Sequence, residues 1–272
     1  MLYLSWQLEP VLLGGILAMA AAYYLAVGPL RSRLAPGEKY PVKQATIFGI
    51  GLIVLFVNEG SPLHDLAERY LLSAHMTQHL LLSYLIAPLL LAGMPAWLLR
   101  SMLVKSRLRG VAKVMLTPLV TFFTFTLVMS FYHLPSVYNL ALGNTSFHHS
   151  VHFVLLLASL MVWWPLVSPL EELPRPPYLT RLAYLFLLPV AQTPIFAGIT
   201  FSDQPLYLYH HMPTRAFGLG VMEDQALAGA VMKIGGMVAF GIRFIGVFFS
   251  WYRSERTPGQ GFEMGRPASN KA

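Results

Sequence analysis

The chain has 272 residues, of which 56% are hydrophobic and only 11% are charged, and its net charge is +7. Soluble domains carry about 25% charged residues, so this composition excludes an ordinary soluble domain and indicates a polytopic membrane protein. Because the chain has no cysteine, disulfides, thiolate zinc sites and a cysteine nucleophile are excluded as well.

In chain order, apolar segments alternate with short polar connections, and the length allows spans of about 20 residues each. Seven spans are predicted, at about 8–30, 44–57, 73–99, 114–133, 147–167, 182–201 and 224–252. Pro88 in the third span predicts a kink, because proline removes a backbone hydrogen bond. The loop Asn58–Leu72 is predicted to hold a short interfacial helix. The predicted fold is therefore an all-α bundle, one membrane domain over 1–252, followed by a polar, disordered tail over 253–272.

Basic residues are concentrated in alternate connections. One set of connections and the tail carries Arg31, Arg33, Lys39, Lys43, Arg100, Lys105, Arg107, Arg109, Lys113, Arg175, Arg181, Arg253, Arg256, Arg266 and Lys271. The opposite loops contain only Arg69 and Arg215. Because basic loops remain in the cytoplasm, this pattern predicts the N-terminus outside and the C-terminus and tail inside.

All the histidines fall on the predicted outer side: His64, His75, His79, His133, His148, His149, His152, His210 and His211. Two pairs have the spacing that places both imidazoles on one helix face, His75 with His79 and His148 with His152. His133 ends the helix between these pairs, so the three helix ends could converge. The alternative is that short basic cytoplasmic loops leave little room for histidine, and that these side chains pack at the interface.

Imidazole binds zinc, copper, iron and nickel, and Met76 adds a thioether beside His79. The thioether, and the absence of carboxylates within this cluster of residues, favour copper. Haem is the alternative, but the histidines of each pair lie one turn apart and near the surface, which suits a small ion better.

The pattern of these residues resembles the CtaG family of cytochrome c oxidase assembly factors. The resemblance rests on four motifs, in this order: Ser73-Ala74-His75-Met76-x-Gln78-His79-Leu80-Leu81-Leu82 followed by Ala87-Pro88-Leu89-Leu90 and Gly93-x-Pro95; His133-x-Pro135-x-x-Tyr138; His148-x-x-x-His152 ahead of Trp163-Trp164-Pro165; and Asp224-Gln225-x-x-x-Gly229-x-x-Met232. They cover the third to the seventh predicted span.

The resemblance implies a multi-pass protein of the bacterial plasma membrane that is not an enzyme and supplies copper, as Cu(I), to a haem-copper oxidase. Its implied partners are the oxidase catalytic subunit, an extracytoplasmic copper donor and the lipid bilayer, with no nucleic acid. The metal ligands that the resemblance implies are His75, His79, His133, His148 and His152. The residues themselves add Met76 as a thioether ligand, with Gln78, Asp224 and Gln225 as supporting residues. A metal- or haem-dependent redox protein and a metal-free assembly scaffold remain the alternatives.

This chain departs from the family pattern at two positions. Val151 stands where a glutamate is common, so an acceptor that would orient an imidazole must come from elsewhere. Lys233 stands where an aromatic residue is common, and its charge within a span needs a partner, a water path or a route to the interface. Its candidate partners are Glu59, Asp203, Glu223 and Asp224.

Three further expectations concern packing. Asp224 is expected chiefly to cap the N-terminus of the seventh span, at whose start it lies, with a role in the metal site as the alternative. Gly229, Gly235 and Gly236 are expected to allow close helix packing. The tryptophans are expected to be interfacial anchors: Trp97, Trp163, Trp164 and Trp251.

Overall fold

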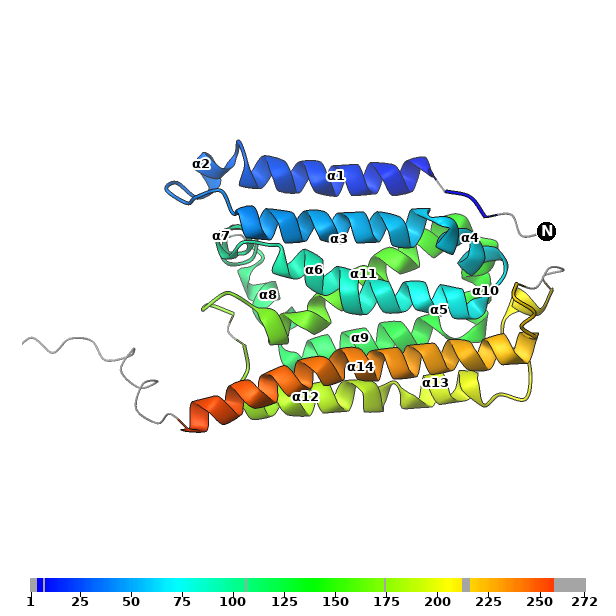
Figure 1. Cartoon of the computed structure of the whole chain (residues 1–272). Helices are drawn as coiled ribbons and strands as arrows, with labels where there is room; N and C mark the ends of the chain where they lie inside the picture. The colour runs from blue at the N-terminus through cyan, green and yellow to red at the C-terminus, as the bar shows by residue number, and fades with distance from the viewer. Residues whose placement is uncertain (1–3, 7, 106, 174, 212–215, 257–272) are drawn as a thin grey trace, which may run out of the picture.

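The computed structural model describes residues 4–6, 8–105, 107–173, 175–211 and 216–256, and within these ranges the chain forms helices and no β-strand. The long helices lie side by side along one axis (Figure 1). Six are long and apolar enough to cross a membrane: α1 (Pro10–Val27), α3 (Val42–Gly60), α5 to α6 (Leu72–Ala92), α11 (Thr145–Val167), α12 to α13 (Tyr178–Thr200) and α14 (Val221–Arg256). The prediction of an all-α membrane bundle is confirmed.

A bent pair of helices, fourth in chain order, is the candidate for a seventh crossing. Helices α8 (Arg109–Met115) and α9 (Pro118–Tyr132) meet at an angle of 71°. Pro118 is the first residue of α9, where its missing N–H costs nothing. Helix α9 alone has 15 residues and spans about 22 Å at 1.5 Å per residue. The predicted fourth span, 114–133, covers α9 and the last two residues of α8.

The third span ends earlier than predicted and contains an irregular turn. Helix α5 (Leu72–Leu81) continues through a π-helical turn, η1 (Leu82–Ile86), into α6 (Ala87–Ala92). Helix α6 ends at Ala92, seven residues before the predicted limit of Leu99, which lies in the separate helix α7 (Ala96–Leu99). The irregularity expected at Pro88 thus takes the form of the π-helical turn that precedes it.

Two of the tryptophans expected at the interface lie inside the bundle, and one of them contacts the π-helical turn. Trp163 and Trp164 of α11 are buried, at 5% and 4% exposure, so that prediction is wrong for both. The indole Nε1 of Trp163 donates to the Ser83 carbonyl at 2.9 Å. A tryptophan N–H inside the bundle therefore pairs with a carbonyl of the irregular turn. Either group would be costly to bury without this partner.

Short helices lie at the two ends of the bundle (Figure 1). At one end are α2 (Arg31–Leu34), α7, the π-helical turn η2 (Arg100–Val104) and α8. At the other are α4 (Pro62–Arg69), α10 (Pro135–Gly143) and the 3₁₀ turn η3 (Leu208–His211). The start of α1 and the end of α14 lie at opposite ends, as an odd number of crossings requires. Which end faces the cytoplasm stays a prediction.

Glycines on α14 allow the close packing that the sequence predicts. A Cβ at Gly229 would lie 2.8 Å from the Phe196 carbonyl oxygen and 2.9 Å from the Thr200 amide of α13. At Gly235 and Gly236 an added Cβ would instead meet side-chain atoms, those of Leu80 and Tyr84. Helix α14 therefore packs directly on the third span, which carries the first histidine pair. Of the predicted tail, residues 253–256 continue α14, and 257–272 lie outside the described residues.

Candidate metal centre

The end of the bundle that holds α4 and α10 brings together five histidines from three helices. His75 and His79 lie on α5, His148 and His152 on α11, and His133 is the C-cap residue of α9. All five are buried, with exposures between 0% and 7%. The expectation of a site near the surface is therefore wrong: the imidazoles lie inside the bundle.

The first turn of α5 is fixed by α14. The Asp224 carboxylate accepts hydrogen bonds from the amides of Leu72 (2.8 Å) and Ser73 (3.1 Å) and from the Ser73 hydroxyl (2.5 Å). These amides are among the unpaired donors at a helix N-terminus, where a negative charge is also favourable. Asp224 thus caps α5, whereas the sequence suggests a cap of its own helix, α14. This cap fixes the backbone three residues before His75.

Ring nitrogens of three histidines converge in the interior. Nε2 of His79 lies 2.9 Å from Nε2 of His75 and 3.1 Å from Nε2 of His152. His148 lies beside them, and ring nitrogens of His75, His148 and His152 lie within 4.8 Å of one another. Two nitrogens that bind one ion tetrahedrally at about 2.0 Å are about 3.3 Å apart. The spacing of this buried group therefore fits a metal ion.

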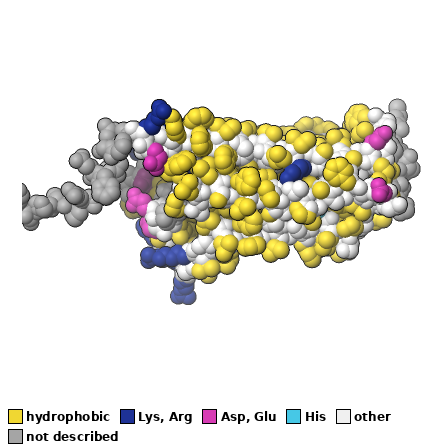
Figure 2. All heavy atoms as spheres, turned by 90° about the horizontal axis from the view of Figure 1, so that it is seen from below, with side chains coloured by type: hydrophobic (Ala, Val, Ile, Leu, Met, Phe, Trp, Pro, Cys, Tyr) yellow, Lys and Arg dark blue, Asp and Glu magenta, His cyan; other side chains and the backbone are white. Residues whose placement is uncertain are grey.

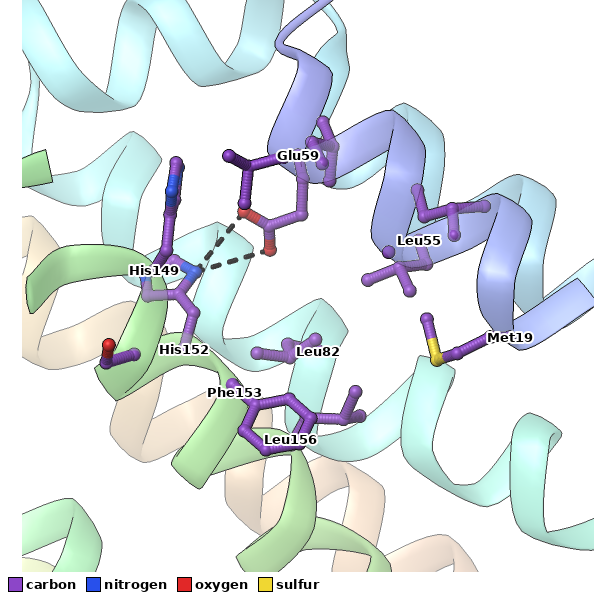
Figure 3. Close-up of a pocket in the computed structure, with 13 residues that line it drawn as sticks. Met19, Leu55, Glu59, Leu82, His149, His152, Phe153 and Leu156 are labelled. Carbon is purple, nitrogen blue, oxygen red and sulfur yellow. Dashed lines mark hydrogen bonds and ion pairs between the residues drawn. The ribbon is translucent and has the colours of Figure 1, made fainter. Parts of the chain in front are cut away.

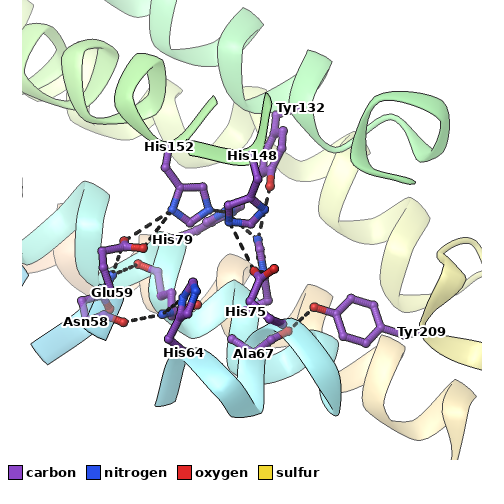
Figure 4. Close-up of polar contacts among 12 residues, drawn as sticks. Asn58, Glu59, His64, Ala67, His75, His79, Tyr132, His148, His152 and Tyr209 are labelled. Carbon is purple, nitrogen blue, oxygen red and sulfur yellow. Dashed lines mark hydrogen bonds and ion pairs between the residues drawn. The ribbon is translucent and has the colours of Figure 1, made fainter. Parts of the chain in front are cut away.

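Two glutamates contact the outer sides of these rings (Figure 4). Glu68 of α4 lies 3.3 Å from Nδ1 of His75 and 3.3 Å from Nε2 of His148. Glu59 of α3 lies 3.2 Å from Nδ1 of His152. The expectation that the cluster lacks carboxylates is wrong. These carboxylates supply from α3 and α4 the acceptors that Val151 cannot provide.

Neither glutamate could be assigned to the site from its spacing in the sequence. The chain leaves the helical path at Tyr70 and Leu71, between α4 and α5, so the separation of Glu68 from His75 has no helical meaning. Glu59 lies in the last turn of α3, although the sequence assigns it to a loop. Burial alone would raise the pKa of Glu68, but the hydrogen bond and charge interactions with histidines outweigh it and lower this pKa to about 2. Glu68 is therefore ionised at neutral pH.

The carboxylates favour one tautomer of the rings that they contact. A carboxylate accepts hydrogen bonds, so it favours an N–H at Nδ1 of His75 and at Nδ1 of His152, and in that tautomer Nε2 of each neutral ring has a lone pair. Both lone pairs point to Nε2 of His79. A proton on Nε2 of His79 can be donated to His152. The Tyr132 hydroxyl, 3.3 Å from Nε2 of His75, is placed to donate to His75. The rings therefore direct two lone pairs to a common centre.

His133 and Met76 form a second pair beside this group. Nε2 of His133 lies 3.2 Å from the Met76 sulfur, and its Nδ1 contacts the Met129 carbonyl at 2.7 Å. The ring centres of His133 and His79 are 5.5 Å apart. An N–H at Nδ1 leaves the Nε2 lone pair facing the thioether. This arrangement places an imidazole and a thioether, both suited to a soft ion, next to the rings of His75, His79 and His152.

The other predicted support residues connect helices and loops. Gln78 and Asn58 exchange hydrogen bonds between side chain and backbone, which ties α5 to α3, and Gln78 lies 3.5 Å from Nδ1 of His64. Gln225 accepts from the Leu206 amide at 2.8 Å and donates to the Gln204 carbonyl at 3.1 Å. Among the remaining histidines, the side chains of His210 and His211 lie outside the described residues.

A hollow of about 370 Å³ between α1, α3 and α11 ends at the site (Figure 3). Its walls are mostly apolar, including Met19, Leu55 and Phe153, and Glu59 and His152 lie at its polar end. Helix α1 is loosely packed, since only Tyr23 and Val27 are buried within it. Beside this hollow, Nε2 of His149 lies 3.3 Å from the Glu9 carboxylate. The histidine group is thus bordered on one side by an apolar opening.

Fold and site together define a multi-pass membrane protein with a buried histidine group that could hold a metal ion. The family described as cytochrome c oxidase caa3 assembly factor matches residues 21–254, which is most of the chain. The chain belongs to this family, which confirms the resemblance seen in its motifs. No curated protein and no solved structure matches it significantly.

Proposed function

We propose that this protein binds Cu(I) at the buried histidine group and supplies it to the copper centre of a haem-copper cytochrome c oxidase during assembly. The ligands are His75, His79, His148 and His152, with His133 and Met76 as a neighbouring pair. Copper is the cargo in this role, and the protein catalyses no reaction. The family assignment supports the assembly role, and the donor set supports the metal.

One observation carries the proposal: Nε2 of His75 and Nε2 of His152 lie 2.9 Å and 3.1 Å from Nε2 of His79, in a buried position. A cation at this centre replaces the protons that otherwise hold the rings together. In the metal-free form the Tyr132 hydroxyl and an N–H of His79 can donate to the converging rings, whereas Nδ1 of His79 and both ring nitrogens of His148 have no hydrogen-bond partner among the described residues. Buried nitrogens without a partner are costly, so they favour uptake of an ion.

The spacing also favours a small ion over haem. The nitrogens of the three converging rings lie about one hydrogen-bond length apart, so a porphyrin would have to separate α5 from α11. The carboxylates of Glu59 and Glu68 face the nitrogens that would not bind the ion. They orient the imidazoles and offset the positive charge of the ion, which raises affinity without adding hard oxygen ligands.

Two approaches to the site are proposed for the two transfer steps. Glu68 is 25% exposed at the end of the bundle and would receive copper from an extracytoplasmic donor. The apolar hollow between α1 and α11 reaches Glu59 and His152 from within the membrane, and would face the oxidase catalytic subunit. With the predicted orientation, this end of the bundle lies outside the plasma membrane of a bacterial cell.

Metal analysis of the purified protein tests the proposal. About one copper per chain is expected in the wild type, with loss of copper in His75→Ala and in His152→Ala. His149→Ala is the matched control, because His149 lies on the same helix beside His148 but contacts Glu9 outside the group. Oxidase activity of membranes from complemented cells provides the functional readout and should fall together with copper content.

Two outcomes would replace the proposal. A Soret band in the wild type that both alanine variants lose would identify a haem protein. Full oxidase assembly by both copper-free variants would leave a scaffold that acts through protein contacts alone. Loss of copper in His149→Ala equal to that in His152→Ala would show that the effect is not specific to the converging rings.

A further inference from the structure

A lysine lies deep in the membrane-spanning part of α14. Lys233 is twelve residues after the start of α14 at Val221, or about 18 Å along a helix that rises 1.5 Å per residue. Its Nζ donates to the Pro189 carbonyl at 2.8 Å and to the Thr193 hydroxyl at 2.6 Å. Pro189 lies in the last turn of α12 (Tyr178–Ala191), and Thr193 is the first residue of α13. The lysine therefore points to the neighbouring helices and does not extend to the interface.

Three of the four acidic partners considered for Lys233 are engaged elsewhere, and Asp203 forms no ion pair with it. Glu59 contacts His152, Asp224 caps α5, and Glu223 accepts from the Gly220 amide at 3.0 Å. Within the part of the chain that the structure describes, no carboxylate forms an ion pair with Lys233. The prediction of an acidic partner among these residues is wrong.

The hydrogen bonds leave the charge of Lys233 incompletely compensated. An ammonium group has three donors, and two acceptors are present. The C-terminal end of α12 contributes a partial negative charge, equivalent to about half a unit in an isolated helix. A full positive charge in hydrocarbon remains costly, and such residues usually pair with another charge. The site thus has positive charge and donor capacity to spare.

The surface around Lys233 is an apolar groove. A hollow of about 260 Å³ lies between α12 and α14 and includes Pro189, Lys233 and Met237 in its lining. Gly241 continues the groove along α14, and a Cβ at this position would meet nothing within 4 Å. Figure 2 shows this face as largely hydrophobic between charged ends, interrupted near its middle by basic side-chain atoms. Such a surface can accept another helix at close range.

We propose that this groove binds a transmembrane helix of a partner protein, and that a carboxylate on that helix forms an ion pair with Lys233. The carboxylate supplies the missing charge and the third acceptor. A phospholipid headgroup fits less well, because Lys233 lies about 10 Å from the end of α13 (Thr193–Thr200) and about 18 Å from the start of α14. This surface does not depend on metal binding, and so it stands apart from the copper proposal.

The test measures binding of synthetic helices to the reconstituted full chain in phosphatidylcholine vesicles. The probes are two fluorescent leucine- and alanine-rich transmembrane peptides that differ only in a central glutamate or glutamine. Energy transfer to a label on the protein reports binding at pH 7. The glutamate peptide should bind wild type at least tenfold more tightly than the glutamine peptide. Lys233→Met should remove this preference, and Lys233→Arg should retain it.

Equal binding of the two peptides to the wild type would overturn the proposal without requiring any variant to fold. A preference that persists in Lys233→Met would place the recognition elsewhere on the chain. If anionic phosphatidylglycerol in the vesicles abolishes the preference, the groove binds lipid headgroups and the proposal is wrong. Copper content of Lys233→Met should match that of the wild type, which separates this result from failure of the histidine site.

Discussion

Replacement of Glu68 by glutamine tests how the carboxylates support metal binding. Glu68→Gln keeps the shape of the side chain and removes a charge that lies 3.3 Å from both His75 and His148. The pKa of about 2 means that the wild-type carboxylate is ionised throughout the neutral range, so the substitution removes a full charge. Metal affinity should therefore fall, because the two rings lose the acceptor that orients them.

The size of the effect follows from contact and exposure. Loss of a residue that orients a metal ligand costs about tenfold to a hundredfold in affinity. Glu68 contacts two rings, which argues for a large effect, but it is 25% exposed, so that water partly screens its charge. We expect about a tenfold rise in the Cu(I) dissociation constant, or about 1.4 kcal/mol.

The assay is a competition titration of the detergent-solubilised protein against a chromophoric Cu(I) chelator. Glu9→Gln is the matched control, since Glu9 also lies 3.3 Å from a histidine, His149, but outside the converging rings. An unchanged dissociation constant in Glu68→Gln would refute the role of this carboxylate. An equal loss in Glu9→Gln would show a general effect of charge at this end of the bundle.

Three further predictions concern helix packing, the cap of α5 and orientation. Gly229→Ala should lower the free energy of unfolding by about 1–3 kcal/mol, because its Cβ meets backbone atoms of α13, and the unfolding temperature in detergent should fall accordingly. Gly241→Ala, with open space around its Cβ, should cause no loss. Asp224→Ala should cost about 1–2 kcal/mol of unfolding free energy in a denaturant titration and should weaken copper binding, because two amides of α5 lose their acceptor; unchanged copper affinity would separate the cap from the site. Since the chain has no cysteine, a membrane-impermeant maleimide on intact cells should label Ser146→Cys and leave Ser32→Cys unlabelled, and the reverse pattern would invert the predicted orientation.

The apolar segments and the histidine spacing could be interpreted from the sequence alone. Hydrophobic length determines which segments can cross a bilayer, because every backbone polar group in the hydrocarbon must be paired within its helix. Four-residue spacing within one helix, as in His75 with His79, is a local property and needs no knowledge of neighbours. These local rules account for the correct fold class and for the two histidine pairs.

Contacts between helices were decided only by the tertiary structure. Glu68 and Glu59 reach the histidines from α4 and α3, across a break in the chain and from another span, so no spacing in the sequence relates them. Asp224 caps a helix about 150 residues away in the sequence, and Trp163 pairs with a carbonyl that is exposed by a π-helical turn. Lys233 likewise finds its acceptors at a helix break on α12. Sequence patterns determine which groups are polar and which face they occupy, whereas packing of separate helices determines which polar groups meet.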